Sequence, residues 1–186
     1  MVPLLLRVQA DPAAALGPQT RRHPRRASDL RGIFQDAGAL EALIRDGNPV
    51  IYETFEAPVP ASEGHLMFGM TVLYPGRVGD EYFMTKGHYH ERRLTAEVYL
   101  GIRGRGCLVV QTEDGRSRML PMEPGGVVYV APGWAHRSVN TGAEPFIFFF
   151  TFPADAGHDY AAVARSGFDL LVVHRTGAPA VVERSR

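Results

Sequence analysis

Four side chains with metal-binding chemistry lie close together in the middle of the sequence. His88 and His90 are two residues apart, Glu97 comes seven residues later, and His136 follows the turn-like segment 131–135. Side chains two apart on an extended chain point to the same side, so the two imidazoles can converge. On its own, a His-x-His pair favours two polar residues at a strand edge. Three imidazoles and one carboxylate together favour a divalent transition metal over magnesium or calcium.

Short β-rich segments separated by turns must position these side chains. We predict strands over 65–74, 82–86, 97–103, 107–112, 117–122, 127–130, 145–152 and 168–173, and helices over 36–46 and 159–166. The Asp114-Gly115 pair is typical of a hairpin, and 20 glycines with 14 prolines suit many tight turns. The pattern predicts a mainly β fold, a sandwich or barrel with a few short peripheral helices.

Length and composition limit the functional classes. A chain of 186 residues suits one domain, since domains mostly span about 100–200 residues. We interpret residues 1–36 as an N-terminal arm that packs on the barrel or on a dimer partner, and residues 37–186 as the domain that carries the site. The arm includes a basic cluster, which we interpret as solvated, formed by Arg21, Arg22, Arg25 and Arg26.

Charge, cysteine content and hydropathy exclude several kinds of binding and of cross-link. The 20 basic and 20 acidic side chains cancel, so the chain lacks the positive field of nonspecific nucleic-acid binding. The single cysteine, Cys107, excludes an intrachain disulfide and a cysteine-cluster metal site, and its apolar surroundings indicate a core residue. No stretch reaches the roughly 18 apolar residues of a membrane helix, and the first residues lack the pattern of a signal peptide. We therefore expect a cytoplasmic protein without membrane or nucleic-acid partners.

The candidate ligands and nearby glycines resemble the two metal-binding motifs of the cupin superfamily. The first motif is His88-x-His90, Glu97 and Gly104, and the second comprises Gly125, Ala131, Trp134, His136 and Asn140. The gap between His90 and Glu97 is longer than usual, and Ala131 and Trp134 replace a proline and a glycine. The resemblance implies a double-stranded β-helix, the jelly-roll barrel of the cupins.

A narrower resemblance covers residues 52–173. The segments GDEYFMTKGH at 79–88, VYV at 128–130, WAHR at 134–137, VNTG at 139–142 and PADAGHDY at 153–160 resemble the archaeal-type, cupin-fold phosphoglucose isomerase family. The resemblance implies a metal-dependent, homodimeric aldose–ketose isomerase that interconverts glucose 6-phosphate and fructose 6-phosphate in glycolysis and gluconeogenesis.

The resemblance also implies roles for individual residues. The metal ligands would be His88, His90, Glu97 and His136, and Fe2+ is the first choice, ahead of Mn2+, Ni2+, Zn2+ and Co2+. The substrate pocket would comprise Tyr52, Thr71, Thr85, Gly87, Tyr99, His158 and Tyr160. Glu97 would act as the base and His158 as a proton shuttle. Lys86 is placed either to reach the phosphate or to point away, and Phe152 stands where a tyrosine hydroxyl is expected.

Two other functions fit the same four ligands. A metal-dependent cupin dioxygenase can use three histidines and a glutamate, but it predicts an apolar pocket. A noncatalytic sugar-binding cupin is the second alternative, although such proteins often lack a ligand. The polar residues Thr71, Thr85, His158 and Tyr160 favour the isomerase. The sequence leaves open the metal, the choice between an enediol and a hydride shift, and the use of mannose 6-phosphate.

Overall fold

The computed structural model describes residues 20–184 as a mainly β protein. A six-stranded sheet has the order β1 (Arg21–Arg26), β2 (Val50–Glu56), β3 (Leu66–Leu73), β11 (Phe146–Pro153), β6 (Glu97–Arg103) and β9 (Val127–Val130). A three-stranded sheet has the order β10 (Trp134–Asn140), β7 (Gly106–Thr112) and β8 (Ser117–Met122). A four-stranded sheet has the order β13 (Ala178–Glu183), β12 (Leu170–Arg175), β5 (Glu81–Tyr82) and β4 (Arg77–Val78).

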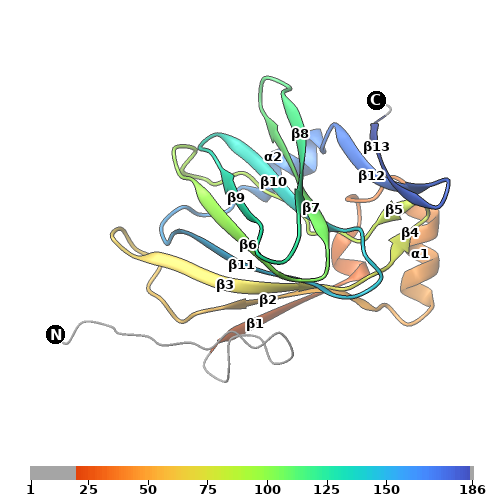
Figure 1. The fold of residues 1–186 in the computed structure, drawn as a ribbon, viewed down its shortest axis with the longest axis horizontal. Coiled ribbons are helices and arrows are strands. Elements are labelled where there is room, and N and C mark those ends of the chain that lie inside the picture. Colours follow the sequence, from red (N-terminus) through yellow and green to blue (C-terminus); the bar gives the residue numbers. More distant parts are fainter. Residues whose placement is uncertain (1–19, 185–186) are drawn as a thin grey trace.

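The strands wrap around a common interior, and the helices lie at its periphery (Figure 1). The helices are the short 3-10 helix η1 (Ala27–Leu30), α1 (Ala37–Arg45) and α2 (Tyr160–Ser166). The predicted mainly β barrel of jelly-roll type with a few short peripheral helices is confirmed. Both predicted α-helices form, and the carboxylates of Asp36 and Asp159 cap their N-termini by accepting backbone N–H groups. No helix in residues 20–184 is long and apolar enough to cross a membrane.

The core is built from side chains that point to the inner face of each strand, at every second residue. In β11, Phe146, Phe148, Phe150 and Phe152 are buried and at most 5% exposed. They pack with Leu73 of β3 and Leu108 of β7 in one hydrophobic cluster. Cys107 is 2% exposed, as predicted for a core residue. This packing holds the six-stranded and three-stranded sheets face to face, and the chemistry-bearing residues lie between them.

The structure corrects the predicted strand over 82–86. Strand β5 ends at Tyr82, and Met84 forms only an isolated bridge with Val139. The backbone of Gly87 has a φ of +74°, which an extended strand does not allow. His88 and Tyr89 therefore form single bridges with His136 and Asp159 instead of lying in a regular strand.

Several strands were not predicted from the sequence. The structure adds β2, β4, β10 and β13, as well as β1 within the predicted N-terminal arm. Strand β1 pairs antiparallel with β2 as an edge strand, with an irregularity between Arg25 and Arg26. Residues 1–19 of the predicted arm lie outside the described residues, so the division into residues 1–36 and 37–186 stays a prediction.

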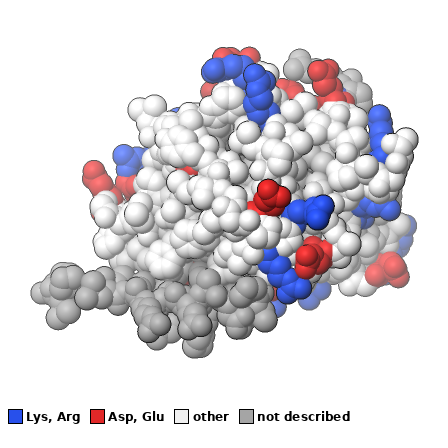
Figure 2. All heavy atoms as spheres, in the orientation of Figure 1, with Lys and Arg blue, Asp and Glu red and all other residues white. Residues whose placement is uncertain are grey.

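The outer face of the six-stranded sheet is also apolar. Met70 and Ile147 form a second small cluster, against which Phe55, Val72 and Ile102 pack. Along the same face, the rings of Phe68 and Phe149 are in contact, and the exposed side chains include Leu66, Val127 and Tyr129. In Figure 2, charged side chains gather at the top, on the right, near the centre and at the left edge, and few lie over β3, β6 and β9.

Candidate active site

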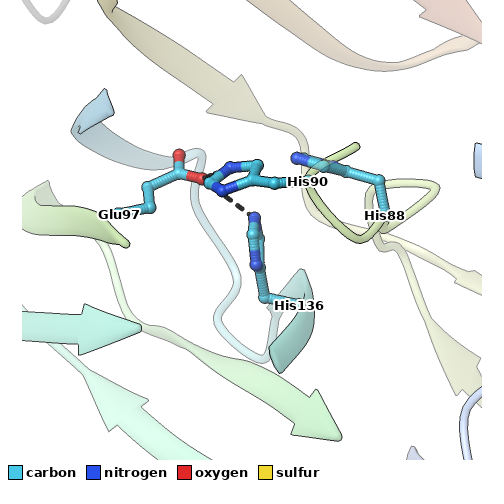
Figure 3. Close-up of side chains that lie close together, drawn as sticks. All are labelled: His88, His90, Glu97 and His136. Carbon is cyan, nitrogen blue, oxygen red and sulfur yellow. Dashed lines mark hydrogen bonds and ion pairs between the residues drawn. The ribbon is translucent and has the colours of Figure 1, made fainter. Parts of the chain in front are cut away.

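The structure brings the four predicted metal ligands together. One ligand atom from each of His88, His90, Glu97 and His136 lies within 4.8 Å of the others (Figure 3). Glu97 is the first residue of β6, and His136 belongs to β10. His88 is held by two backbone hydrogen bonds with His136, at 3.2 and 3.0 Å. His90, Glu97 and His136 are each at most 5% exposed, so this is a buried polar cluster inside the barrel.

Hydrogen bonds set the tautomers of two of these histidines. The hydroxyl of Thr95 donates to the Arg92 carbonyl at 2.6 Å, so it can only accept from His90 Nδ1, which lies 2.7 Å away. His136 Nδ1 lies 3.3 Å from the carbonyl of Trp134, which also can only accept. Both Nδ1 atoms therefore carry protons, and both neutral imidazoles present a bare Nε2.

These bare nitrogens face a carboxylate oxygen. Glu97 Oε2 lies 3.1 Å from His90 Nε2 and 2.9 Å from His136 Nε2. The Nε2 atoms of His88 and His136 are buried without a hydrogen-bond partner among the described residues. Electron-rich atoms this close repel one another unless a cation or a proton lies between them. The residues present therefore fit a divalent metal.

The protonation states agree with metal binding. Burial alone raises the pKa of Glu97, but in the metal-free site His136 and His90 outweigh burial when they carry a proton on Nε2, and they then hold this pKa well below its usual range. Burial, with the neighbouring His136 and His158, lowers the pKa of His88 well below 6.5. An ionised carboxylate and a neutral imidazole are the forms that coordinate a metal.

A cavity of about 280 Å³ opens onto this cluster. His88, Glu97 and His136 line it, whereas His90 lies behind its wall. All of the predicted substrate residues line the same cavity, and they are Tyr52, Thr71, Thr85, Gly87, Tyr99, His158 and Tyr160. Phe152 lines it as well, whereas Lys86 does not. The cavity thus joins the four predicted metal ligands to a set of hydrogen-bonding groups.

The segment from Thr85 to Gly87 is fixed against β10. Thr85 accepts the backbone N–H of Ser138 through its hydroxyl at 3.0 Å, and its own N–H donates to the Ser138 carbonyl at 2.9 Å. The Gly87 N–H donates to no other described residue. Burial raises the pKa of the Tyr52 hydroxyl, which contacts the backbone of Lys86. Tyr52 therefore remains a neutral hydrogen-bond donor beside this segment.

Aromatic rings hold His158 over the cluster. Its ring stacks on that of Tyr160 at 5.7 Å and lies edge-on to His88 at 4.4 Å and to Phe152 at 5.4 Å. Burial lowers the pKa of His158 below 6.5, so the imidazole is neutral near pH 7. Because Phe152 has no hydroxyl, this wall offers packing where the resemblance implies a hydrogen bond.

Sequence analysis missed part of the cavity wall. The structure adds His23, Arg25, Thr54, Glu56, Arg137, Ser138, Phe148 and Phe150. Alternation along β2 places Thr54 and Glu56 on the same side as Tyr52, a signal that recognition of this strand would have provided. Arg137 directly follows His136 and is 4% exposed. Burial lowers its pKa to about 9, which still leaves it charged near pH 7.

Comparison with known proteins agrees with this geometry. A family model described as "Glucose-6-phosphate isomerase (GPI)" matches residues 24–184. The chain is 46% identical over 181 residues to a glucose-6-phosphate isomerase of Pyrococcus abyssi, covering 97% of this chain and 96% of that protein. It is 50% identical over 162 residues to the enzyme of Pyrococcus horikoshii, covering 87% and 86%. A putative glucose-6-phosphate isomerase 2 of Rhizobium meliloti is 40% identical over 159 residues, covering 85% and 80%. The chain therefore belongs to the glucose-6-phosphate isomerase family.

Proposed function

We propose that this chain interconverts glucose 6-phosphate and fructose 6-phosphate in glycolysis and gluconeogenesis, with a divalent metal held by His88, His90, Glu97 and His136. The observation that carries the proposal is the convergence of bare imidazole nitrogens and an ionised carboxylate at the wall of a polar cavity. Membership of the isomerase family supports the reaction. A dioxygenase predicts an apolar pocket, so the hydroxyl-rich wall favours the isomerase over it. Noncatalytic sugar-binding cupins often lack a metal ligand, so the complete set of four favours the isomerase over that alternative.

The reaction moves a hydrogen between C1 and C2 of the open-chain sugar. When bound, a divalent metal acts as a Lewis acid that stabilises negative charge on the sugar oxygens. Glu97 is the carboxylate placed to take a proton from the sugar. Its low pKa makes it a weak base, so a direct hydride shift remains an alternative to the enediol route. Burial and the nearby Glu97 raise the pKa of Tyr99 well above 10, so its hydroxyl stays protonated and can donate.

His158 is suited to moving a proton during ring opening. Its imidazole lines the cavity, is neutral near pH 7, and forms no hydrogen bond with another residue of the range 20–184. A neutral imidazole in this position can accept the proton of a sugar hydroxyl and return it to a neighbouring oxygen. Tyr160 fixes the plane of the ring by stacking on it.

We propose Fe2+ as the resident metal. Imidazole and carboxylate ligands in this number suit iron, and they also accept Mn2+, Ni2+, Zn2+ and Co2+. Elemental analysis of the protein purified from its own host, followed by reconstitution with each metal in turn, decides among them. Iron at about one atom per chain is the expected result, and another metal at that occupancy contradicts it.

A second copy of this chain is the partner that we propose for the outer face of the six-stranded sheet. On this face Leu66 is 62% exposed, Val127 64% and Tyr129 61%. An apolar sheet face of this kind is typical of a homodimer interface. Light scattering coupled to size-exclusion chromatography should give the mass of a dimer, and Tyr129→Lys should lower it toward the monomer. A monomeric wild-type protein contradicts this interface.

The cytoplasm is the compartment that we propose. The chain's single thiol, Cys107, is buried, and burial raises its pKa to about 12. Free thiols without disulfides are typical of reducing compartments.

Turnover of fructose 6-phosphate tests the proposed activity. Purified protein is assayed by coupling product formation to glucose-6-phosphate dehydrogenase, before and after chelation and after adding back single metals. Activity that disappears with the chelator and returns with Fe2+ or Mn2+ supports the isomerase. A folded, metal-loaded protein that consumes oxygen with an organic acid, or that binds sugar without turnover, supports an alternative instead.

A further inference from the structure

The substrate's phosphate needs a positive partner, which the predicted residues do not include. Tyr52, Thr71, Thr85 and Gly87 offer only neutral donors. Lys86, the only lysine of the chain, does not line the cavity. A sugar phosphate is close to a dianion near pH 7, and proteins bind such groups most strongly through charged donors. The cationic side chains that do line the cavity are Arg25 and Arg137, together with the titratable His23.

Arg137 is already engaged by the protein. One terminal nitrogen donates to the sulfur of Met84 at 3.0 Å, and the other donates to the Lys86 carbonyl at 3.1 Å. Its guanidinium also stacks on the ring of Phe168, 4.1 Å from the ring centre. These contacts hold Arg137 against the segment that carries Thr85 and Gly87. They leave only its Nε, which is buried, without a partner among the described residues.

Arg25 also lines the cavity, and it belongs to the edge strand β1. In Figure 1, β1 runs along the edge of the six-stranded sheet beside β2. Arg25 is the cross-strand partner of Tyr52, whose hydroxyl contacts the backbone of Lys86. The charge of Arg25 also lowers the pKa of Tyr160 against the effect of burial. Arg25 is therefore close to Tyr52 and Tyr160, two residues of the predicted substrate pocket.

The guanidinium of Arg25 has no carboxylate partner among the described residues. Its only hydrogen bond is to the neighbouring Pro24 carbonyl, at 3.0 Å. The carboxylate on this part of the wall, Glu56, lies 3.4 Å from His23 Nε2. By contrast, Arg22 forms an ion pair with Glu53. Arg25 is thus a half-buried cation at the cavity, and most of its guanidinium N–H groups have no partner among the described residues.

We infer that Arg25 binds the substrate's phosphate and makes the site specific for phosphorylated sugars. The inference rests on the proposed function, and it makes β1 part of the substrate-binding site. The planar guanidinium can donate two parallel hydrogen bonds to phosphate oxygens, which a threonine or an amide cannot do. Arg25 would add a charged donor to the neutral donors of Thr85 and Gly87, which line the same cavity.

Arg25→Gln tests this inference, with Arg26→Gln as the matched control. Arg26 is the next residue of the same strand, is exposed and does not line the cavity. We expect Arg25→Gln to raise the KM for fructose 6-phosphate by about tenfold to a hundredfold, the effect of losing hydrogen bonds from a charged group. Arg25→Lys should recover part of the loss, and Arg26→Gln should leave KM unchanged. Metal affinity should stay the same in all three variants.

Calorimetric titration with inorganic phosphate provides a readout that does not require activity. Phosphate should bind the metal-free wild-type protein and Arg26→Gln alike, and should bind Arg25→Gln more weakly by the same factor as the change in KM. Equal phosphate binding by the wild type and Arg25→Gln overturns the inference, as does equal impairment of Arg26→Gln. If the wild type binds phosphate through Arg25 but does not turn over fructose 6-phosphate, the proposed function fails while the phosphate subsite stands.

Discussion

Thr95→Val should weaken metal binding although Thr95 is not a metal ligand. The Thr95 hydroxyl accepts from His90 Nδ1 at 2.7 Å and thereby leaves Nε2 bare. Removing such a supporting hydrogen bond costs about 10–100-fold in metal affinity. The Thr95 carbonyl remains as a poorer acceptor, 3.4 Å from Nδ1. We therefore expect the lower end of the range, a loss of about tenfold or about 1.4 kcal/mol.

Competition with a chromophoric chelator for Co2+ or Zn2+ measures this loss. Thr95→Ser is the matched control, because it keeps the hydroxyl that accepts from His90 and removes only a methyl group. Thermal unfolding of the metal-free variants shows whether both fold like the wild type. Wild-type affinity in Thr95→Val, or equal weakening in Thr95→Ser, would refute the assignment of the His90 tautomer and of its Nε2 as the ligand atom.

Three further predictions concern single side chains. Glu97→Gln removes the anionic ligand, so metal affinity should fall by more than the roughly 100-fold of a supporting residue, and a metal-loaded variant with full activity contradicts this. The folded pKa of His158 is lowered from 6.5, so the unfolded chain takes up its proton first as the pH falls. The free energy of unfolding of the metal-free protein should therefore decrease below pH 6.5, and His158→Gln should flatten this decrease in urea titrations. Cys107 has a pKa of about 12, so a thiol reagent should label it slowly near pH 8 in the folded protein and fully in urea.

The part of the site that depends on residue type could be predicted from the sequence. His88, His90, Glu97 and His136 carry their chemistry in their side chains, and the two-residue spacing of His88 and His90 on an extended chain predicted convergence. The structure shows that this convergence does not need a regular strand at His88 and His90. Two backbone hydrogen bonds join His88 to His136 and bring these two residues together.

The position of Arg25 at the cavity could not be predicted from the sequence, because it depends on pairing between distant segments. A run such as Arg21–Arg26 has no apolar alternation, so its pattern does not indicate a strand. Only its pairing with β2 places Arg25 opposite Tyr52. The tautomer of His90 likewise depends on the hydroxyl of Thr95, and a single sequence gives no sign of that contact.

Titration of the chelated protein with Fe2+ under anaerobic conditions tests the central claim most directly. The rate of glucose 6-phosphate formation from fructose 6-phosphate is measured after each addition. If the four residues bind the metal, the chelated protein should have negligible activity. The rate should then rise linearly with added Fe2+ and stop rising at about one equivalent per chain. Full activity in the chelated protein, or no activity at any metal content, would contradict the proposed metal-dependent isomerisation.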